Sequence, residues 1–206
     1  MSRFLRLQEY DLLHGPVQAL LSASALANHC TIAEVISREW NTTICDSPMG
    51  ILASCHRNDH LQLGRMIMKQ VALLPHASFV HVNDVGARGE KIFEYVKSVS
   101  QRIQERGDAG YQPRLHFDLY GTIGDAFRDA EIPDFLAKVE LAARLYDVLI
   151  ESPIVRSSNE SQIRRLRQLK KSLAARKINV KIVADEWCNT LDEKNIRSSR
   201  ESVVIK

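Results

Sequence analysis

Short apolar runs alternate with longer stretches of helical periodicity along most of the chain. The runs are residues 48–54, 78–83, 115–118, 147–151, 181–184 and 203–206. Between them, apolar residues recur every three or four positions, which is the spacing of one buried helix face. Strands that alternate with helices in this order indicate an α/β fold with a parallel sheet.

The stretches between the runs predict four helices, at residues 59–71, 89–106, 132–143 and 161–177. The last one is rich in cations, but Leu166, Leu169 and Leu173 keep helical spacing within it. Its charges are therefore expected to form a solvated face. Nucleic-acid binding is the weaker interpretation, because no aromatic residues interleave with the cations.

The amino-terminal part has a different pattern and predicts two helices within residues 11–40. Pro16 is placed in the first turn of the first helix, where its missing N–H is tolerated. Thr31 and Glu34 have the spacing of a capping box at the start of the second. The polar stretch 41–47 then predicts a boundary, with residues 1–47 as a helical segment and 48–206 as the α/β part.

An acid ends or follows three consecutive apolar runs, at Asp118, Glu151 and Asp185. The first two acids are 33 residues apart and the last two are 34 apart, which suits one strand, one helix and their connections. One such acid alone is more typical of a cap or an ion pair. Three acids on one rim of a β/α barrel repel each other unless a cation lies among them, and oxygen ligands favour Mg²⁺.

Two alternatives compete with a barrel that holds a hard cation. A doubly wound sheet has the same alternation, but Gly50 is a lone glycine and no phosphate-binding loop follows the first run. Cys55, His56 and His60 could form a site for a softer metal, although a fourth ligand is not evident. The sequence supports both alternatives less well than it supports a barrel whose three acids hold a hard cation.

Composition narrows the function classes only slightly. The 28 basic and 25 acidic residues give a net charge of +3, too balanced to indicate nucleic acid or a membrane as partner. No signal peptide or apolar run of membrane length is apparent, so a cytoplasmic protein is expected. The four cysteines lack paired spacing and are expected to be free thiols.

Several motifs resemble methylaspartate ammonia-lyases, a family of the enolase superfamily. They include LPHA at 74–77, LHFDLYGTIG at 115–124, IESP at 150–153 and KIVADEWCNT at 181–190. The resemblance extends over nearly the whole chain. It implies a partial TIM-type barrel of about six strands, 48–206, preceded by the helical end of a capping domain, 1–47.

The resemblance also implies a reaction and its residues. Ammonia would be eliminated reversibly from L-threo-3-methylaspartate to give mesaconate, in glutamate degradation. Lys206 in VIK matches the catalytic lysine and His76 in LPHA the acid–base histidine, while Asp118, Glu151 and Asp185 match the ligands of Mg²⁺. On residue type alone, His76 is more often structural. The family further implies a small amino-acid substrate, a stimulating monovalent cation such as K⁺ and a possible homodimer.

The chain departs from the family pattern at two substrate-binding positions and in length. Ser54 and Val204 stand where the family has glutamines, so weaker orientation of the substrate is expected. A complete barrel has eight strands, whereas the chain offers about six. We therefore expect little or no lyase activity from residues 1–206 alone, and a non-catalytic remnant or interaction module is the alternative function.

Overall fold

A computed structural model describes residues 3–184 and 203–205 of the 206-residue chain. The chain divides into two compact units, Met1–Met49 and Gly50–Lys206. Each unit is described by itself.

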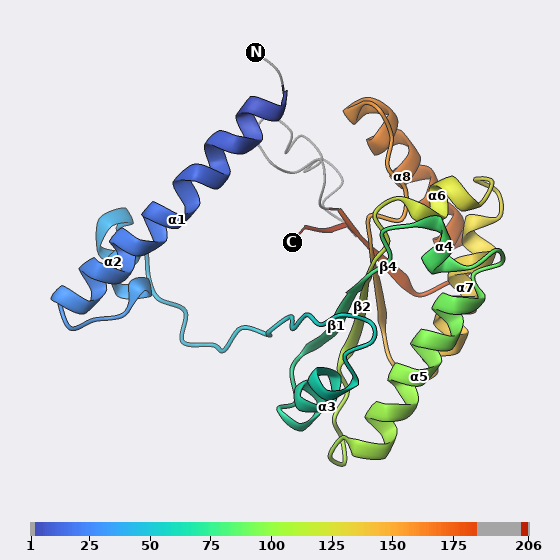
Figure 1. Cartoon of the computed structure of the whole chain (residues 1–206), viewed down its shortest axis with the longest axis horizontal. Helices are drawn as coiled ribbons and strands as arrows, with labels where there is room; N and C mark the ends of the chain where they lie inside the picture. The colour runs from blue at the N-terminus through green and yellow to red at the C-terminus, as the bar shows by residue number, and fades with distance from the viewer. Residues whose placement is uncertain (1–2, 185–202, 206) are drawn as a thin grey trace. The chain divides into compact units, whose positions relative to one another are not determined.

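The first unit contains two helices, α1 (Arg3–Ala27) and α2 (Ile32–Trp40) (Figure 1). Thr31 caps α2: its hydroxyl accepts a hydrogen bond from the Glu34 backbone, and its own N–H donates to the Glu34 carboxylate at 2.6 Å. The hydrogen bond from the Thr31 backbone lowers the pKa of Glu34. The placement of Pro16 in a first turn is wrong, because α1 begins before it and Pro16 lies inside the helix.

Among the described residues, no single helix has the length and apolar composition needed to cross a membrane. The segments Gly15–Ala27 and Ile32–Trp40 pass that test only when taken together, and a bend of 98° separates them.

The second unit is built on a five-stranded parallel sheet in the order β1-β2-β3-β4-β5 (Figure 1). Its strands are β1 (Leu73–Ser78), β2 (Arg114–Asp118), β3 (Val148–Glu151), β4 (Val180–Ala184) and β5 (Val203–Ile205). The strands follow one another in chain order, as in a barrel wall, whereas a doubly wound sheet changes direction at a switch point. The prediction of an α/β fold with a parallel sheet is confirmed.

Helices connect the strands and form a layer beside the sheet. They are α3 (His60–Met68), α4 (Val82–Val85), α5 (Glu90–Arg106), α6 (Thr122–Ala126), α7 (Ile132–Ala143) and α8 (Asn159–Ala175). Contacts join α3 to α5, α5 to α7 and α7 to α8, in chain order. On α8, Leu166, Leu169 and Leu173 are buried, as the helical spacing predicted.

The prediction of a strand at residues 78–83 is wrong, because β1 spans Leu73–Ser78 and α4 begins at Val82. Pro75 hid this strand, since a residue without an N–H is rarely found inside a sheet. Within the segment predicted as the first strand, 48–54, Ile51 and Ala53 contact β1: Leu73 N–H donates to the Ile51 carbonyl, and Ala53 N–H donates to the Leu73 carbonyl. Only Leu52 forms a bridge there, because Pro75 offers no donor to continue the ladder.

Alternation along β2 and β3 gives the sheet two different faces. Leu115 and Phe117 of β2 and Ile150 of β3 belong to the apolar core. The residues that alternate with them, His116 and Asp118, point to the other face, together with Glu151 of β3. The sheet therefore presents a buried polar face opposite its apolar core face.

Candidate functional site

Two of the predicted acids lie next to each other at the carboxyl ends of neighbouring strands. Asp118 is the last residue of β2, Glu151 is the last residue of β3, and the two are paired in register. Paired residues in a parallel sheet point to the same face, and their strands are about 4.8 Å apart. Asp118 is 3% exposed and Glu151 is fully buried. The strand register thus brings two carboxylates together in the interior.

His76 reaches this pair because β1 is irregular at that position. The pairing of β1 with β2 shifts between Pro75 and Ala77, so His76 is an extra residue that lies between two register pairs. Its φ of 46° lies in the left-handed region, which is strained for a side chain of this size and is frequently found at functional sites. His76 Nε2 lies 3.2 Å from Glu151 Oε2.

Ser54 orients the His76 ring from the other side. Its hydroxyl lies 3.3 Å from His76 Nδ1 and donates to the His76 carbonyl at 3.4 Å. With one ring nitrogen beside Ser54, the other nitrogen faces Glu151. In this chain, the hydroxyl at the first predicted substrate-binding position therefore contacts the histidine.

His116 also belongs to the site, and the sequence analysis missed it. Its Nε2 lies 3.3 Å from the same Glu151 Oε2, and the His76 and His116 ring centroids are 4.9 Å apart with a tilt of 36°. The side chain is only 2% exposed. The sequence does contain one signal for it: His116 stands two residues before Asp118, and residues two apart in a strand lie on the same face of the sheet. Its proximity to Glu151 depends on strand register, which the sequence pattern does not give.

The loops after β2 and β3 are packed tightly together and so fix the ends of both acid-bearing strands. Gly121, with φ of +82°, donates its N–H to the Ser152 carbonyl at 2.7 Å. A Cβ at Gly121 would lie 3.0 Å from the Val155 Cβ, and one at Gly124 3.2 Å from Ile154 Cγ2. At Gly121, whose backbone is left-handed, only glycine permits this close approach.

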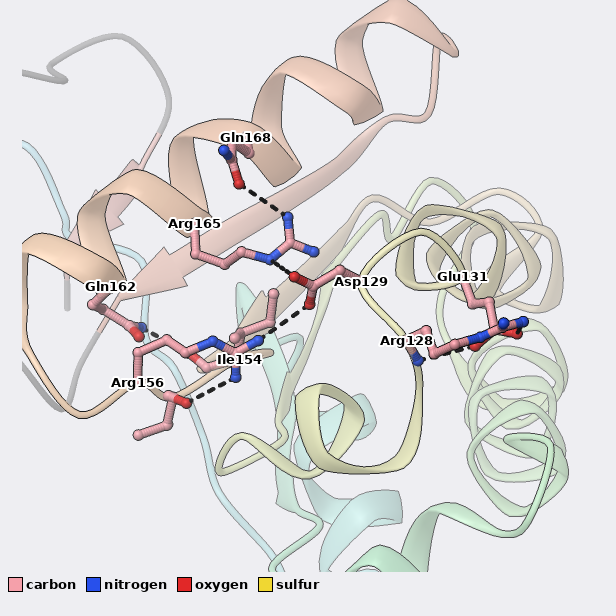
Figure 2. A network of polar contacts seen from close by, with 9 residues as sticks. Arg128, Asp129, Glu131, Ile154, Arg156, Gln162, Arg165 and Gln168 are labelled. Atoms are coloured by element: carbon pink, nitrogen blue, oxygen red, sulfur yellow. Dashed lines mark hydrogen bonds and ion pairs between the residues drawn. The ribbon is translucent and has the colours of Figure 1, made fainter.

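Polar contacts hold the loop after β3 against α8, as Figure 2 shows. Asp129 pairs with Arg156 at 3.1 Å and with Arg165 of α8 at 2.7 Å. The buried Gln162 side chain of α8 donates to the Ile154 carbonyl at 2.7 Å. These contacts connect the Glu151 strand end to an outer helix, so the site is supported by the surrounding fold.

The other predicted site residues are only partly covered by the structure. Asp185 and Lys206 lie outside the described residues. Val204 is in β5, where its backbone pairs with Val183 of β4. Val183 in turn pairs with Glu151, so the order of the sheet places β4 between the Glu151 and Val204 strands.

The possible metal-ligand atoms of the described residues suit two kinds of cation. Asp118 and Glu151 supply buried carboxylate oxygens, the ligands that Mg²⁺ prefers. Within residues 3–184 and 203–205, the group of three close enough to share one ion is His76, His116 and Glu151. The soft-metal alternative at Cys55, His56 and His60 is not among the groups found in this part of the chain.

Comparison with known proteins points to one family. A family model described as "Methylaspartate ammonia-lyase C-terminus" matches residues 43–203. Methylaspartate ammonia-lyase 1 of Carboxydothermus hydrogenoformans is 39% identical over 184 residues, which cover 88% of this chain and 44% of that protein. The methylaspartate ammonia-lyase of Citrobacter amalonaticus is 37% identical and is covered to 46%. The chain therefore spans less than half the length of these relatives.

Solved structures give the same result. A magnesium complex of β-methylaspartase from Clostridium tetanomorphum matches with a TM-score of 0.77 and 32% identity, over 91% of this chain and 47% of that one. The Citrobacter amalonaticus enzyme, crystallised with (2S,3S)-3-methylaspartic acid, matches with a TM-score of 0.76 and 35% identity, covering 91% of this chain and 47% of that one. These neighbours confirm the predicted partial TIM-type barrel.

Proposed function

This chain belongs to the methylaspartate ammonia-lyase family, and we propose on that basis that it carries the metal and base residues of an ammonia-lyase. The proposed reaction is the magnesium-dependent, reversible elimination of ammonia from L-threo-3-methylaspartate to give mesaconate. The names of two structural relatives support this choice, since one is a magnesium complex and the other contains (2S,3S)-3-methylaspartic acid.

The observation that carries the proposal is the in-register pair Asp118 and Glu151, buried at adjacent strand ends with His76 beside it. Mg²⁺ would be held by Asp118, Glu151 and Asp185, of which Asp185 lies outside the described residues. Bound there, Mg²⁺ neutralises the negative charge that develops on a substrate carboxylate when a neighbouring carbon loses its proton.

The chain's own groups would move the proton. Lys206 is proposed to take the C3 proton of the threo substrate; the electron pair of that C–H bond forms the C2–C3 double bond while the C2–N bond breaks and ammonia leaves. His76 is proposed to act on the opposite face of the substrate. Its orientation by Ser54 and Glu151 keeps the ring in one position, which proton transfer requires.

The substrate-binding positions favour slow turnover. Ser54 offers a short hydroxyl that already contacts His76, and Val204 has no hydrogen-bonding side chain. A substrate carboxylate or amine that finds no partner at these positions is oriented less firmly, which lowers the rate. This observation favours the second candidate function, a cation-binding interaction module without significant turnover. Stimulation by K⁺, a homodimer and a cytoplasmic location remain predictions.

The test is formation of mesaconate by residues 1–206, followed by its ultraviolet absorbance with magnesium and potassium present. We expect a low rate with the L-threo substrate that Lys206→Ala abolishes, since that variant lacks the proposed base. His76→Ala should instead abolish turnover of the L-erythro diastereomer, whose C3 proton faces the other side.

A matched control is His60→Ala, which removes an exposed imidazole of α3 and should leave both rates unchanged. If Lys206→Ala and His76→Ala each lost turnover of both diastereomers to the same degree, the assignment of the two bases to opposite faces of the substrate would be contradicted. Magnesium binding without any turnover of either substrate would favour the interaction module.

A further inference from the structure

The side chains of His76, His116 and Glu151 form a cluster that the proposed lyase chemistry does not use as a unit. We propose that these three residues form a binding site for a transition-metal dication of the Zn²⁺ class, which shares Glu151 with the proposed magnesium site. The site goes beyond the proposed function and does not depend on it, because it needs only these three described residues.

The ligand atoms have spacings suited to a tetrahedral ion. Zinc binds imidazole nitrogen and carboxylate oxygen at about 2.0–2.2 Å, so adjacent ligand atoms around a tetrahedral ion lie about 3.3–3.6 Å apart. Glu151 Oε2 lies 3.2 Å from His76 Nε2 and 3.3 Å from His116 Nε2. All three ligand atoms are within 4.8 Å of one another. Two edges are thus close to the length that a tetrahedral ion requires, and the third ligand pair is near enough for one ion to reach all three residues.

The donor types select the class of ion. Two imidazoles and one carboxylate suit zinc and its neighbours in the first transition row, whereas Mg²⁺ takes oxygen ligands and keeps several waters. A set of two histidines and one glutamate leaves the fourth position of a tetrahedral site for water. The partial exposure of His76, 16%, provides the open side, while His116 and Glu151 are closed off at 2% and 0%.

The surrounding fold holds the ligands in place. One residue comes from each of the adjacent strands β1, β2 and β3, which are joined by backbone pairing. Ser54 contacts His76 Nδ1 at 3.3 Å, so the Nε2 atom faces Glu151. An outer hydrogen bond of this kind orients a ligating histidine and strengthens metal binding.

Occupation of this site has a consequence for magnesium. Glu151 is shared between the proposed zinc set and the proposed magnesium set, and one carboxylate oxygen at 3.2–3.3 Å from both imidazoles is drawn toward the histidines. Zinc would therefore compete with magnesium and remove His76 from proton transfer. The chain would bind either ion but not both at full occupancy.

The experiment uses tag-free residues 1–206 and titrates Co²⁺ as a spectroscopic probe, followed by displacement with Zn²⁺. We expect one Co²⁺ per chain with the strong visible absorption of tetrahedral coordination, and its loss when Zn²⁺ is added. His76→Ala and His116→Asn should each weaken Zn²⁺ binding more than about tenfold, because each removes one of three protein ligands. Circular dichroism checks that each variant is folded, and if His116→Asn does not fold, His76→Ala decides alone.

Two matched controls separate this site from others. His60→Ala removes an exposed histidine of α3 and should leave Zn²⁺ affinity within about twofold of the unchanged chain. Asp118→Asn should weaken Mg²⁺ binding more than it weakens Zn²⁺ binding, because Asp118 is a proposed ligand of Mg²⁺ alone. Unchanged affinity in His76→Ala would show that the ion binds elsewhere and would overturn the proposal. An equal loss of Zn²⁺ and Mg²⁺ affinity in Asp118→Asn would also overturn the proposal, since zinc would then be bound by the residues proposed to hold magnesium.

Discussion

The two faces of β2 and β3 are equally buried but carry opposite chemistry. Phe117 and Ile150 on one face are fully buried in the apolar core, and His116, Asp118 and Glu151 on the other are exposed by 3% or less. Burial of apolar side chains stabilises the fold, whereas burial of ionisable ones costs free energy unless partners or ions compensate. Folding alone therefore explains the core face, whereas the buried polar face requires a function.

The largest expected effect lies on the core face. Phe117→Ala should lower the free energy of unfolding by about 3–5 kcal/mol, because it leaves a cavity where no neighbour can move in fully. Chemical denaturation measures the change. As a control, Leu141→Ala removes a side chain of α7 that is 79% exposed and should change stability by less than about 0.5 kcal/mol. A similar loss in both variants would mean that the core face is not the source of stability.

A smaller effect is expected on the polar face. His116→Leu replaces the imidazole with an apolar side chain of similar size. The buried Glu151 carboxylate thereby loses one imidazole partner. The free energy of unfolding should fall by about 1–3 kcal/mol, the penalty for a buried group with one partner fewer. Denaturation in metal-free buffer measures it. A gain in stability would indicate that His116 is itself the unfavourable group.

The loop that connects the two strand ends gives the third test. Gly121→Ala should cost more than the about 1–2 kcal/mol of a left-handed backbone alone, because Val155 lies 3.0 Å from the added Cβ. Gly110→Ala is the matched control, since Gly110 also has a positive φ, +87°, but no atom within 4 Å of the new group. Thermal unfolding of both variants isolates the close approach. Equal losses would show that only the backbone conformation matters.

The smallest effect concerns Tyr111, which precedes the first residue of β2 and whose hydroxyl donates to the Val71 carbonyl at 2.7 Å. Burial raises the pKa of Tyr111 from 10.0 to about 12. A raised pKa in the folded state contributes stability below pH 10 that is lost as the pH rises toward 12. Tyr111→Phe should lose about 1 kcal/mol at neutral pH and show a weaker decline between pH 10 and 12. Urea denaturation over that range checks both.

The same contrast between faces explains what the sequence could and could not reveal. Asp118 and Glu151 were predictable because an apolar run that ends in an acid marks a strand end. His116 was missed because its contact with Glu151 depends on the pairing of two strands, which no local pattern specifies. The β1 strand was misplaced because Pro75 looks like a strand breaker. Asp185 and Lys206 stay predictions, since they lie outside the described residues.

The adjacent strand-end acids should form a cation site, and a calorimetric titration with Mg²⁺ measures the affinity of that site. Residues 1–206 should bind one Mg²⁺, and Asp118→Asn should weaken that binding at least about tenfold, because a neutral amide supplies less charge to a hard cation. Asp125→Asn, which changes an exposed acid of α6, should leave the affinity unchanged. Equal affinity in all three proteins, or no binding in the unchanged chain, would contradict the account.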